Sequence, residues 1–221
     1  MPWPGGRPGV GLLPGAPWVA DRHSCCHHPP LIPENSVLAA LIQRAQVQGL
    51  SSDPNLPEES RRILAAADLD RRQLTSAELL CICRESGMDA ALPSKLQSQA
   101  DDLVNKARTH LLEQQPQLVQ PGGALFPSER AEACWRDCWN FLRVIVYAVA
   151  CNQSSFTNQG GMAALRELYQ QMNVPTEGLN IALNQLKTLV LEGLSREADH
   201  ELVSACFQHL SAQLNKAAVK S

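Results

Sequence analysis

A thiol, a guanidinium and a carboxylate lie close together along the chain, at Cys134, Arg136 and Asp137. They sit in its most apolar helix-like stretch, and because a helix turns about 100° per residue, Cys134 and Asp137 share one face with Arg130. A thiol is a nucleophile once it ionises, whereas a carboxylate beside an apolar surface is costly unless a partner donates hydrogen bonds or an opposite charge. We therefore predict a thiol and a carboxylate on one helix face, with the carboxylate paired to Arg130 or Arg143.

A second interpretation of the same stretch involves no chemistry. Cys134 and Cys138 are one helical turn apart, and buried cysteines most often act as small apolar residues. The remaining cysteines are expected to be inert, and Tyr147 and Tyr169 are expected to pack in the core. An enzyme is not indicated, because the sequence shows no nucleophile beside a general base, no spaced metal cluster and no phosphate-binding loop.

The composition of the chain argues against several further classes of function. The chain has 221 residues, 44% of them apolar, which is enough for one globular core. Its net charge of -3 comes without clustered lysine and arginine, so a nucleic-acid partner is not expected. Arg143 interrupts the longest apolar run, so no transmembrane segment of about eighteen residues is expected. The sequence shows no secretory signal, and a reducing compartment is therefore expected.

The start of the chain differs in composition from the rest. Residues 1–33 are rich in proline and glycine, and we expect them to form a disordered tail. The tail carries Cys25, Cys26, His27 and His28 in a row, without the spacing that lets one backbone wrap a zinc ion. A metal site is therefore not the favoured interpretation of these four residues.

From residue 34 onward, helical periodicity alternates with breaks at proline and glycine, and no alternating strand pattern occurs. We expect an extra helical segment at 34–56 and a main domain at 57–221. The predicted fold class is all-α, with about eight helices joined by short turns as in globin-type packing. The helices are expected near residues 37–45, 57–70, 75–87, 93–116, 127–151, 162–172, 179–194 and 202–214.

Several motifs along this domain resemble phycobiliprotein subunits in order and spacing. The segment from Ala67 to Leu79 is similar to the join between the N-terminal hairpin and the first globin-type helix of that family. The middle of the chain resembles the bilin-bearing core of allophycocyanin and phycocyanin chains. This resemblance spans residues 57–217 and rests on Pro121-Gly122-Gly123, Ala133-Cys134-Trp135-Arg136-Asp137, Phe141-Leu142-Arg143, Tyr147 and Leu165-Arg166-Glu167-Leu168-Tyr169.

The resemblance implies a globin-like domain with a protruding N-terminal helical hairpin and a covalently bound open-chain tetrapyrrole. Cys134 matches the cysteine that holds phycocyanobilin or a related bilin by a thioether. Asp137 matches the carboxylate that accepts hydrogen bonds from inner pyrrole nitrogens, and Arg136 and Arg130 match residues that contact propionates. The implied function is light harvesting, with transfer of excitation energy within a phycobilisome.

The resemblance also implies partners and a location. Asp68 and Arg143 match a pair that meets across the interface between unlike subunits, so a related phycobiliprotein subunit is expected in a homodimer, a heterodimer or a larger ring. The expected location is the cytoplasmic face of the thylakoid membrane. Trp135, Trp139 and Asn140 depart from the family pattern and indicate a divergent chain. The alternative function is a pigment-free protein of phycobilisome assembly, turnover or regulation on the same scaffold.

Overall fold

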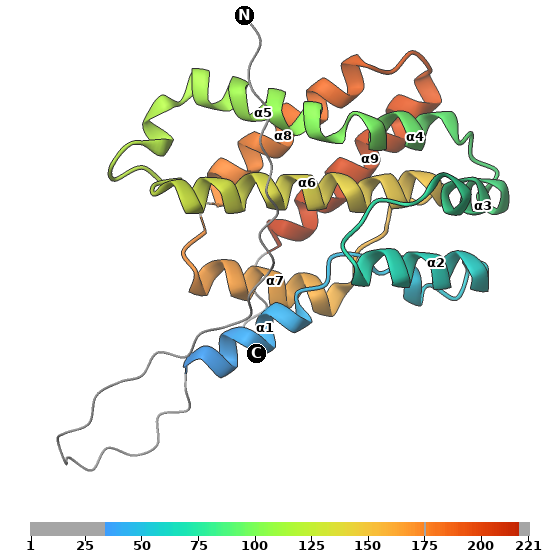
Figure 1. Ribbon diagram of the computed structural model, residues 1–221, viewed down its shortest axis with the longest axis horizontal. Helices are drawn as coiled ribbons and strands as arrows, with labels where there is room; N and C mark the ends of the chain where they lie inside the picture. Colours follow the sequence, from blue (N-terminus) through green and yellow to red (C-terminus); the bar gives the residue numbers. More distant parts are fainter. Residues whose placement is uncertain (1–33, 175, 217–221) are drawn as a thin grey trace, which may run out of the picture. The chain divides into compact units, whose positions relative to one another are not determined.

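The computed structural model describes residues 34–174 and 176–216, so the tail at 1–33, with its cysteines and histidines, lies outside the described residues. Within these ranges the chain is all-α, as predicted, and no described helix is long and apolar enough to cross a membrane (Figure 1). The α-helices are α1 (Glu34–Arg44), α2 (Glu58–Leu69), α3 (Ser76–Ser86), α4 (Ala91–Ser98), α5 (Ala100–Gln114), α6 (Ser128–Ala150), α7 (Gln159–Gln171), α8 (Thr176–Glu192) and α9 (Glu197–Leu214). Two short 3-10 helices are η1 (Leu50–Ser52) and η2 (Pro116–Val119).

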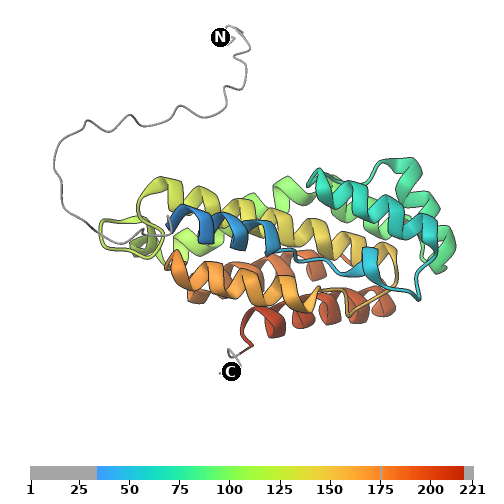
Figure 2. The same cartoon turned by 90° about the horizontal axis from the view of Figure 1, so that it is seen from below.

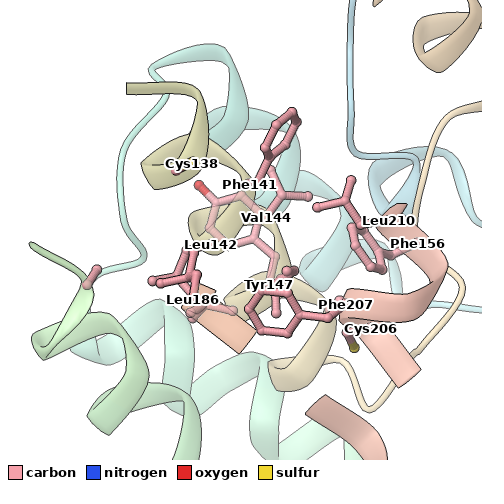
Figure 3. Packing of buried hydrophobic residues seen from close by; sticks show 14 of the residues in the cluster. Cys138, Phe141, Leu142, Val144, Tyr147, Phe156, Leu186, Cys206, Phe207 and Leu210 are labelled. Atoms are coloured by element: carbon pink, nitrogen blue, oxygen red, sulfur yellow. The ribbon is translucent and has the colours of Figure 1, made fainter. Parts of the chain in front are cut away.

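Helix α6 is the element around which the others pack. Residues 141–151 are apolar on every side except at Arg143, and a helix that is apolar all round is stable only when neighbours cover all of it. α3, α4, α5, α8 and α9 all contact α6, and Figures 1 and 2 show it running between them. In Figure 3 the side chains of Phe141 and Tyr147 point into this core, with Phe207 of α9 beside Tyr147.

Helices α2 and α3 form the N-terminal hairpin. Thr75 and Glu78 form a capping box at the start of α3, in which each side chain accepts from the other residue's backbone N–H. The helix ends at Gly87, whose φ of 72° lies in the left-handed region that glycine adopts at no steric cost. Both signals are local, and the predicted start and end of this helix are confirmed.

The predicted long helix at 93–116 is wrong in one respect, because the chain breaks it into α4 and α5 at Gln99. The Asp89 carboxylate accepts from the Ala91 N–H and starts α4 before Pro93, which then lies in the first turn, where no N–H is needed. At the other end, the Gln97 side chain exchanges hydrogen bonds of 2.7 and 3.0 Å with the backbone of Leu74. This contact ties α4 to the hairpin, and α5 takes its own direction along α8. The described chain therefore has nine α-helices where eight were predicted.

The extra segment at 34–56 packs onto α7. Helix α1 lies against α7, and residues 45–50, which we call the strap, run beside the loop that precedes α7. The Gly49 N–H donates to the Phe156 carbonyl at 2.7 Å, and the Asn158 N–H donates to the Val47 carbonyl at 2.8 Å. Gly161 lies so close to the strap that a Cβ there would fall 1.8 Å from a strap carbonyl oxygen, that of Gln46. The approach of two backbones at this point therefore requires glycine.

Candidate functional site

The thiols of Cys134 and Cys138 lie on one face of α6, a helical turn apart. Both side chains are buried, and Cys134 is only 6% exposed. A hydrogen bond with Cys134, together with burial, raises the pKa of Cys138 well above its usual range. Cys138 is therefore held in its protonated form.

The other buried cysteines are poor nucleophiles. Burial raises the pKa of Cys83 to about 11, and it raises the pKa of both Cys151 and Cys206 to about 12. The reactive form of cysteine is the thiolate, so these three thiols are unreactive at neutral pH. This result agrees with the inert role expected for them.

Asp137 has a partner that the sequence did not indicate. The Tyr169 hydroxyl on α7 donates a hydrogen bond to an Asp137 carboxylate oxygen at 2.7 Å. Within the described residues Asp137 makes no ion pair, so the predicted pairing with Arg130 or Arg143 is wrong. Tyr169 packs in the core as expected, and its hydroxyl also reaches this carboxylate from another helix. No local pattern signals a contact between residues 32 positions apart.

Burial is the dominant influence on the Asp137 carboxyl. It raises the pKa of Asp137 above the ordinary value of 3.8, against the opposing effects of the Tyr169 hydrogen bond and of the positive charges on Arg136 and Arg71. The site therefore holds a carboxylate that is short of compensating charge. Such a group favours a neighbour that carries a positive charge or N–H donors.

Arg130 and Arg136 lie on the exposed side of α6 near this carboxylate. Both are solvent-exposed, and neither forms an ion pair with a described residue. Arg136 is two positions from Cys134, so its side chain leaves the helix on a different side and must reach around to approach the thiol. The two guanidinium groups are accessible to anionic groups at the surface.

Two tryptophans next to the thiols were noted in the sequence only as departures from a family pattern. The Trp139 N–H donates to the Asp101 carboxylate on α5 at 2.9 Å. Trp135 is buried, with the guanidinium of Arg108 stacked 5.7 Å from its ring centre, and its N–H has no hydrogen-bond partner among the described residues. Arg108 is itself held by Glu132, at 2.9 Å.

Asp68 and Arg143 form an ion pair within the chain. The Arg143 side chain is 5% exposed and donates to the Asp68 carboxylate at 2.8 Å and to the Tyr147 hydroxyl at 2.8 Å. The Tyr147 hydroxyl in turn donates to the Arg72 carbonyl, so Tyr147 packs in the core as expected and also makes polar contacts there. This cluster fastens the end of α2 to α6. A role for the pair in an interface between subunits remains a prediction.

Two surface cavities lie elsewhere in the described chain. One, of about 190 Å³, is lined by α2, α3 and the end of α6, and includes Ser60, Glu85 and Cys151. The other, of about 630 Å³, lies along α3 and α4 and includes Lys95. Cys134 lines neither of them. A large ligand therefore reaches this thiol only if the side chains that cover it move.

Comparisons with known proteins agree with the resemblance seen in the sequence. The family model described as "Phycobilisome protein" matches residues 62–214. The chain is 33% identical over 129 residues to the C-phycocyanin beta chain of Aglaothamnion neglectum, an alignment that covers 57% of this chain and 75% of the relative. The C-phycocyanin-3 beta subunit of Microchaete diplosiphon is 28% identical, with the same coverage of 57% and 75%.

A solved structure supports the fold independently. It is a far-red fluorescent biliprotein derived from a far-red induced allophycocyanin F subunit of Chroococcidiopsis thermalis, matched with a TM-score of 0.51 and 23% identity. The match covers 57% of this chain and 96% of that one. Because the family model spans well over half of the residues, these findings together fix the family. The chain is a member of the phycobilisome protein family, and its globin-like fold is the fold of phycobiliproteins.

Proposed function

We propose that this chain is a light-harvesting subunit of a phycobilisome that carries an open-chain tetrapyrrole on Cys134. One observation carries the proposal: Asp137 lies on the same face of α6 as Cys134 and is held by the Tyr169 hydroxyl without any ion pair among the described residues. A carboxylate oriented in this way offers an acceptor to the N–H groups of a pyrrole system. Membership of a family that lacks enzymes supports a role without catalysis.

The chemistry of the side chains fits such a pigment. Cys134 supplies the thiol for a thioether, and Cys138 lies one helical turn further along the same face. Asp137 accepts from pyrrole N–H groups, and its negative charge favours a protonated pigment. Arg130 and Arg136 are exposed cations for the propionates, and charge-assisted bonds of this kind are strong and directional. When bound, the pigment supplies absorption of light and passes on the excitation.

The proposed partner is a related phycobiliprotein subunit, in a dimer or a larger ring. The α2–α3 hairpin offers the surface, because Leu69 is 85% exposed and Leu80 is 59% exposed on it. Burying large apolar side chains of this kind against a second chain stabilises the complex. Asp68 and Arg143 lie at the base of the same hairpin. The proposed location is the thylakoid surface, where phycobilisomes collect light.

A second candidate function is a pigment-free protein of phycobilisome assembly or turnover. The burial of Cys134, at 6% exposed, favours it, as does the packing of this thiol against Cys138 and away from both cavities. On this account the two cysteines are small core residues. The hairpin surface would then carry the function.

Co-expression of the chain with a bilin pathway and a set of bilin lyases distinguishes the two functions. A covalent pigment gives zinc-enhanced fluorescence on the protein band of a denaturing gel. We expect a fluorescent band for the wild type and for the control Cys138→Ala, and a dark band for Cys134→Ala. The control matters because both substitutions remove a buried thiol of the same helix face. A wild-type band that stays dark with every lyase would contradict the light-harvesting proposal and favour the pigment-free function.

A further inference from the structure

The smaller of the two cavities lies where the α2–α3 hairpin meets the end of α6 (Figure 1). Its volume is about 190 Å³, and its wall combines the start of α2, the end of α3 and the residues that follow α6. Glu85 is the one charged residue in this wall, which contains no lysine, arginine or histidine. The cavity is therefore built to favour a positive charge.

The Glu85 carboxylate is held at the cavity by a buried hydroxyl. Ser60, on the neighbouring helix α2, is 1% exposed and donates its hydroxyl hydrogen to a Glu85 oxygen. Within the described residues Glu85 makes no ion pair. Arg61 lies nearby, but its Nε–H donates to the Leu56 carbonyl at 3.1 Å and it does not line the cavity. Glu85 is thus an oriented carboxylate without an opposite charge.

The other polar groups of the wall add to the negative potential. Helix α6 ends at Ala150, and the carbonyl end of a helix carries a partial negative charge. Burial raises the pKa of Cys151 to about 12, and the negative charges of Asp53 and Glu85 contribute to that rise. The side-chain amides of Asn152 and Gln153 also line the cavity, and their oxygens are further acceptors.

The size and the apolar part of the cavity limit what kind of cation fits. Pockets for free cofactors and drug-sized ligands usually measure about 300–1,000 Å³, whereas this cavity is closer to the size of one long side chain. Within the described residues no group of three or more metal-ligating side chains occurs, so a tightly held metal ion is not indicated. Leu56 and Ile82 supply buried apolar wall against which a methylene stem can pack.

We propose that this cavity binds the guanidinium group of an arginine side chain from a partner protein. A guanidinium presents five N–H donors in a rigid fork, which suits a carboxylate and several neutral acceptors better than a compact ammonium does. The surface around the cavity is also suited to a protein partner. Leu80, five positions before Glu85 on α3 and so about 8 Å along the helix, is 59% exposed. This inference goes beyond the proposed function and does not depend on a pigment.

Arginine and its neutral analogue test the charge requirement in the full, pigment-free chain. N-acetyl-arginine amide is titrated into 15N-labelled protein at constant ionic strength, and N-acetyl-citrulline amide, which has the same shape without the charge, is the control ligand. We expect saturable shifts of the backbone amide signals of Glu85, Ser86 and Gln153, with a Kd of about 1–10 mM for arginine. Citrulline is expected to shift them without saturation.

A pair of variants tests the role of Glu85. Glu85→Gln keeps an acceptor for the Ser60 hydroxyl but removes the charge, and it is expected to weaken arginine binding about tenfold. Glu58→Gln is the matched control, because it removes an exposed carboxylate of the same hairpin that does not line the cavity. Its Kd is expected to stay within about twofold of wild type. Thermal unfolding of both variants checks that they remain folded.

Three results would overturn the arginine site. They are the absence of saturable shifts in the wild type, equal binding of arginine and citrulline, and equal losses in Glu85→Gln and Glu58→Gln. A titration with magnesium chloride adds a fourth, because the same shifts at the same or a lower concentration would mean that an inorganic cation occupies the cavity. Each of these results leaves the light-harvesting proposal untouched, since no pigment takes part.

Discussion

The N-terminal and C-terminal halves of α6 each carry a polar cluster, one around Asp137 and one around Arg143. The two clusters differ in whether their charged group has an oppositely charged partner. In the second half, Arg143 is paired with Asp68 and with the Tyr147 hydroxyl, and the cluster joins two helices. In the first half, Asp137 has a single hydroxyl donor and no ion pair with any described residue. The Arg143 cluster pairs both of its charges within the chain, although the buried Nε–H of Arg143 has no hydrogen-bond partner among the described residues. The Asp137 cluster leaves a carboxylate without an opposite charge.

This difference indicates that the Arg143 cluster stabilises the fold, whereas the Asp137 cluster is available to a ligand. A buried charge is tolerated when its partners lie in the same chain, and removing one partner then damages folding. A half-buried carboxylate whose charge has no opposite partner is costly to the fold, and a ligand that supplies N–H donors would offset that cost. The Arg143 cluster is therefore expected to respond to mutation through stability, and the Cys134 cluster through pigment binding.

The largest expected effect is that of Arg143→Leu. The substitution leaves the Asp68 carboxylate and the Tyr147 hydroxyl without their shared partner in a buried setting, and we expect a loss of about 3 kcal/mol in the free energy of unfolding. Urea denaturation followed by circular dichroism measures it. Arg136→Leu is the matched control, since it removes an exposed arginine of the same helix and is expected to cost less than about 0.5 kcal/mol. Equal losses in the two variants would remove the contrast between the clusters.

A smaller loss in the free energy of unfolding is expected from a substitution that displaces α7. This helix supplies Tyr169 to the Asp137 cluster and no residue to the Arg143 cluster. In Gly161→Ala the new methyl group would lie 1.8 Å from the Gln46 carbonyl oxygen, so the strap or the helix must shift, at about 1–3 kcal/mol. Gly160→Ala is the control, because its Cβ would meet nothing closer than 3.5 Å and alanine favours a helix. Thermal unfolding compares the two. A melting temperature in Gly161→Ala no lower than in Gly160→Ala would contradict the tight seating of α7.

The smallest effect, of opposite sign, is expected from Asp137→Asn. Burial raises the pKa of Asp137 above 3.8, so between 3.8 and the raised value the folded chain binds more protons than the unfolded chain, and stability falls as pH rises through this window. Asparagine cannot ionise and still accepts from Tyr169. At pH 7 the variant is therefore expected to be at least as stable as wild type.

Urea unfolding at pH 7 and at pH 4 checks this prediction, because the advantage of Asp137→Asn must shrink as the pH falls. A variant that is less stable than wild type at pH 7 would mean that Asp137 is stabilised as an anion. The two clusters would then be alike, and the proposed role of Asp137 toward a pigment would lose its support. The same variant in a pigment-loaded chain is expected to keep the thioether and to lose fluorescence.

The all-α fold and most helix limits could be predicted from the sequence, because they depend on local signals. Thr75 with Glu78 starts a helix and Gly87 ends it, whatever the rest of the chain does. The break at Gln99 could not be predicted, since it follows from contacts of Gln97 with Leu74, 23 residues away along the chain. Helical periodicity alone continues through that point.

For the candidate site, the sequence predicts which residues share one face of α6. It does not predict which residues of other helices contact them. The residues of one face of α6 follow from helical spacing, which is why Cys134 and Asp137 were grouped correctly. Their partners come from other elements: Tyr169 lies on α7, and Asp101, which satisfies Trp139, lies on α5. Such pairs depend on how helices pack, and neither spacing nor charge order in a single sequence encodes it.

The strap has a practical consequence for anyone trimming this protein. The family match begins at residue 62, whereas α1 and the strap lie before it, at 34–50. A fragment cut to the family limits would leave bare the side of α7 that α1 and the strap cover, and Gly161 would lose its contact with the Gln46 backbone. Expression of such a fragment is expected to yield aggregated material, and residue 34 is the latest starting point that keeps α1 and the strap.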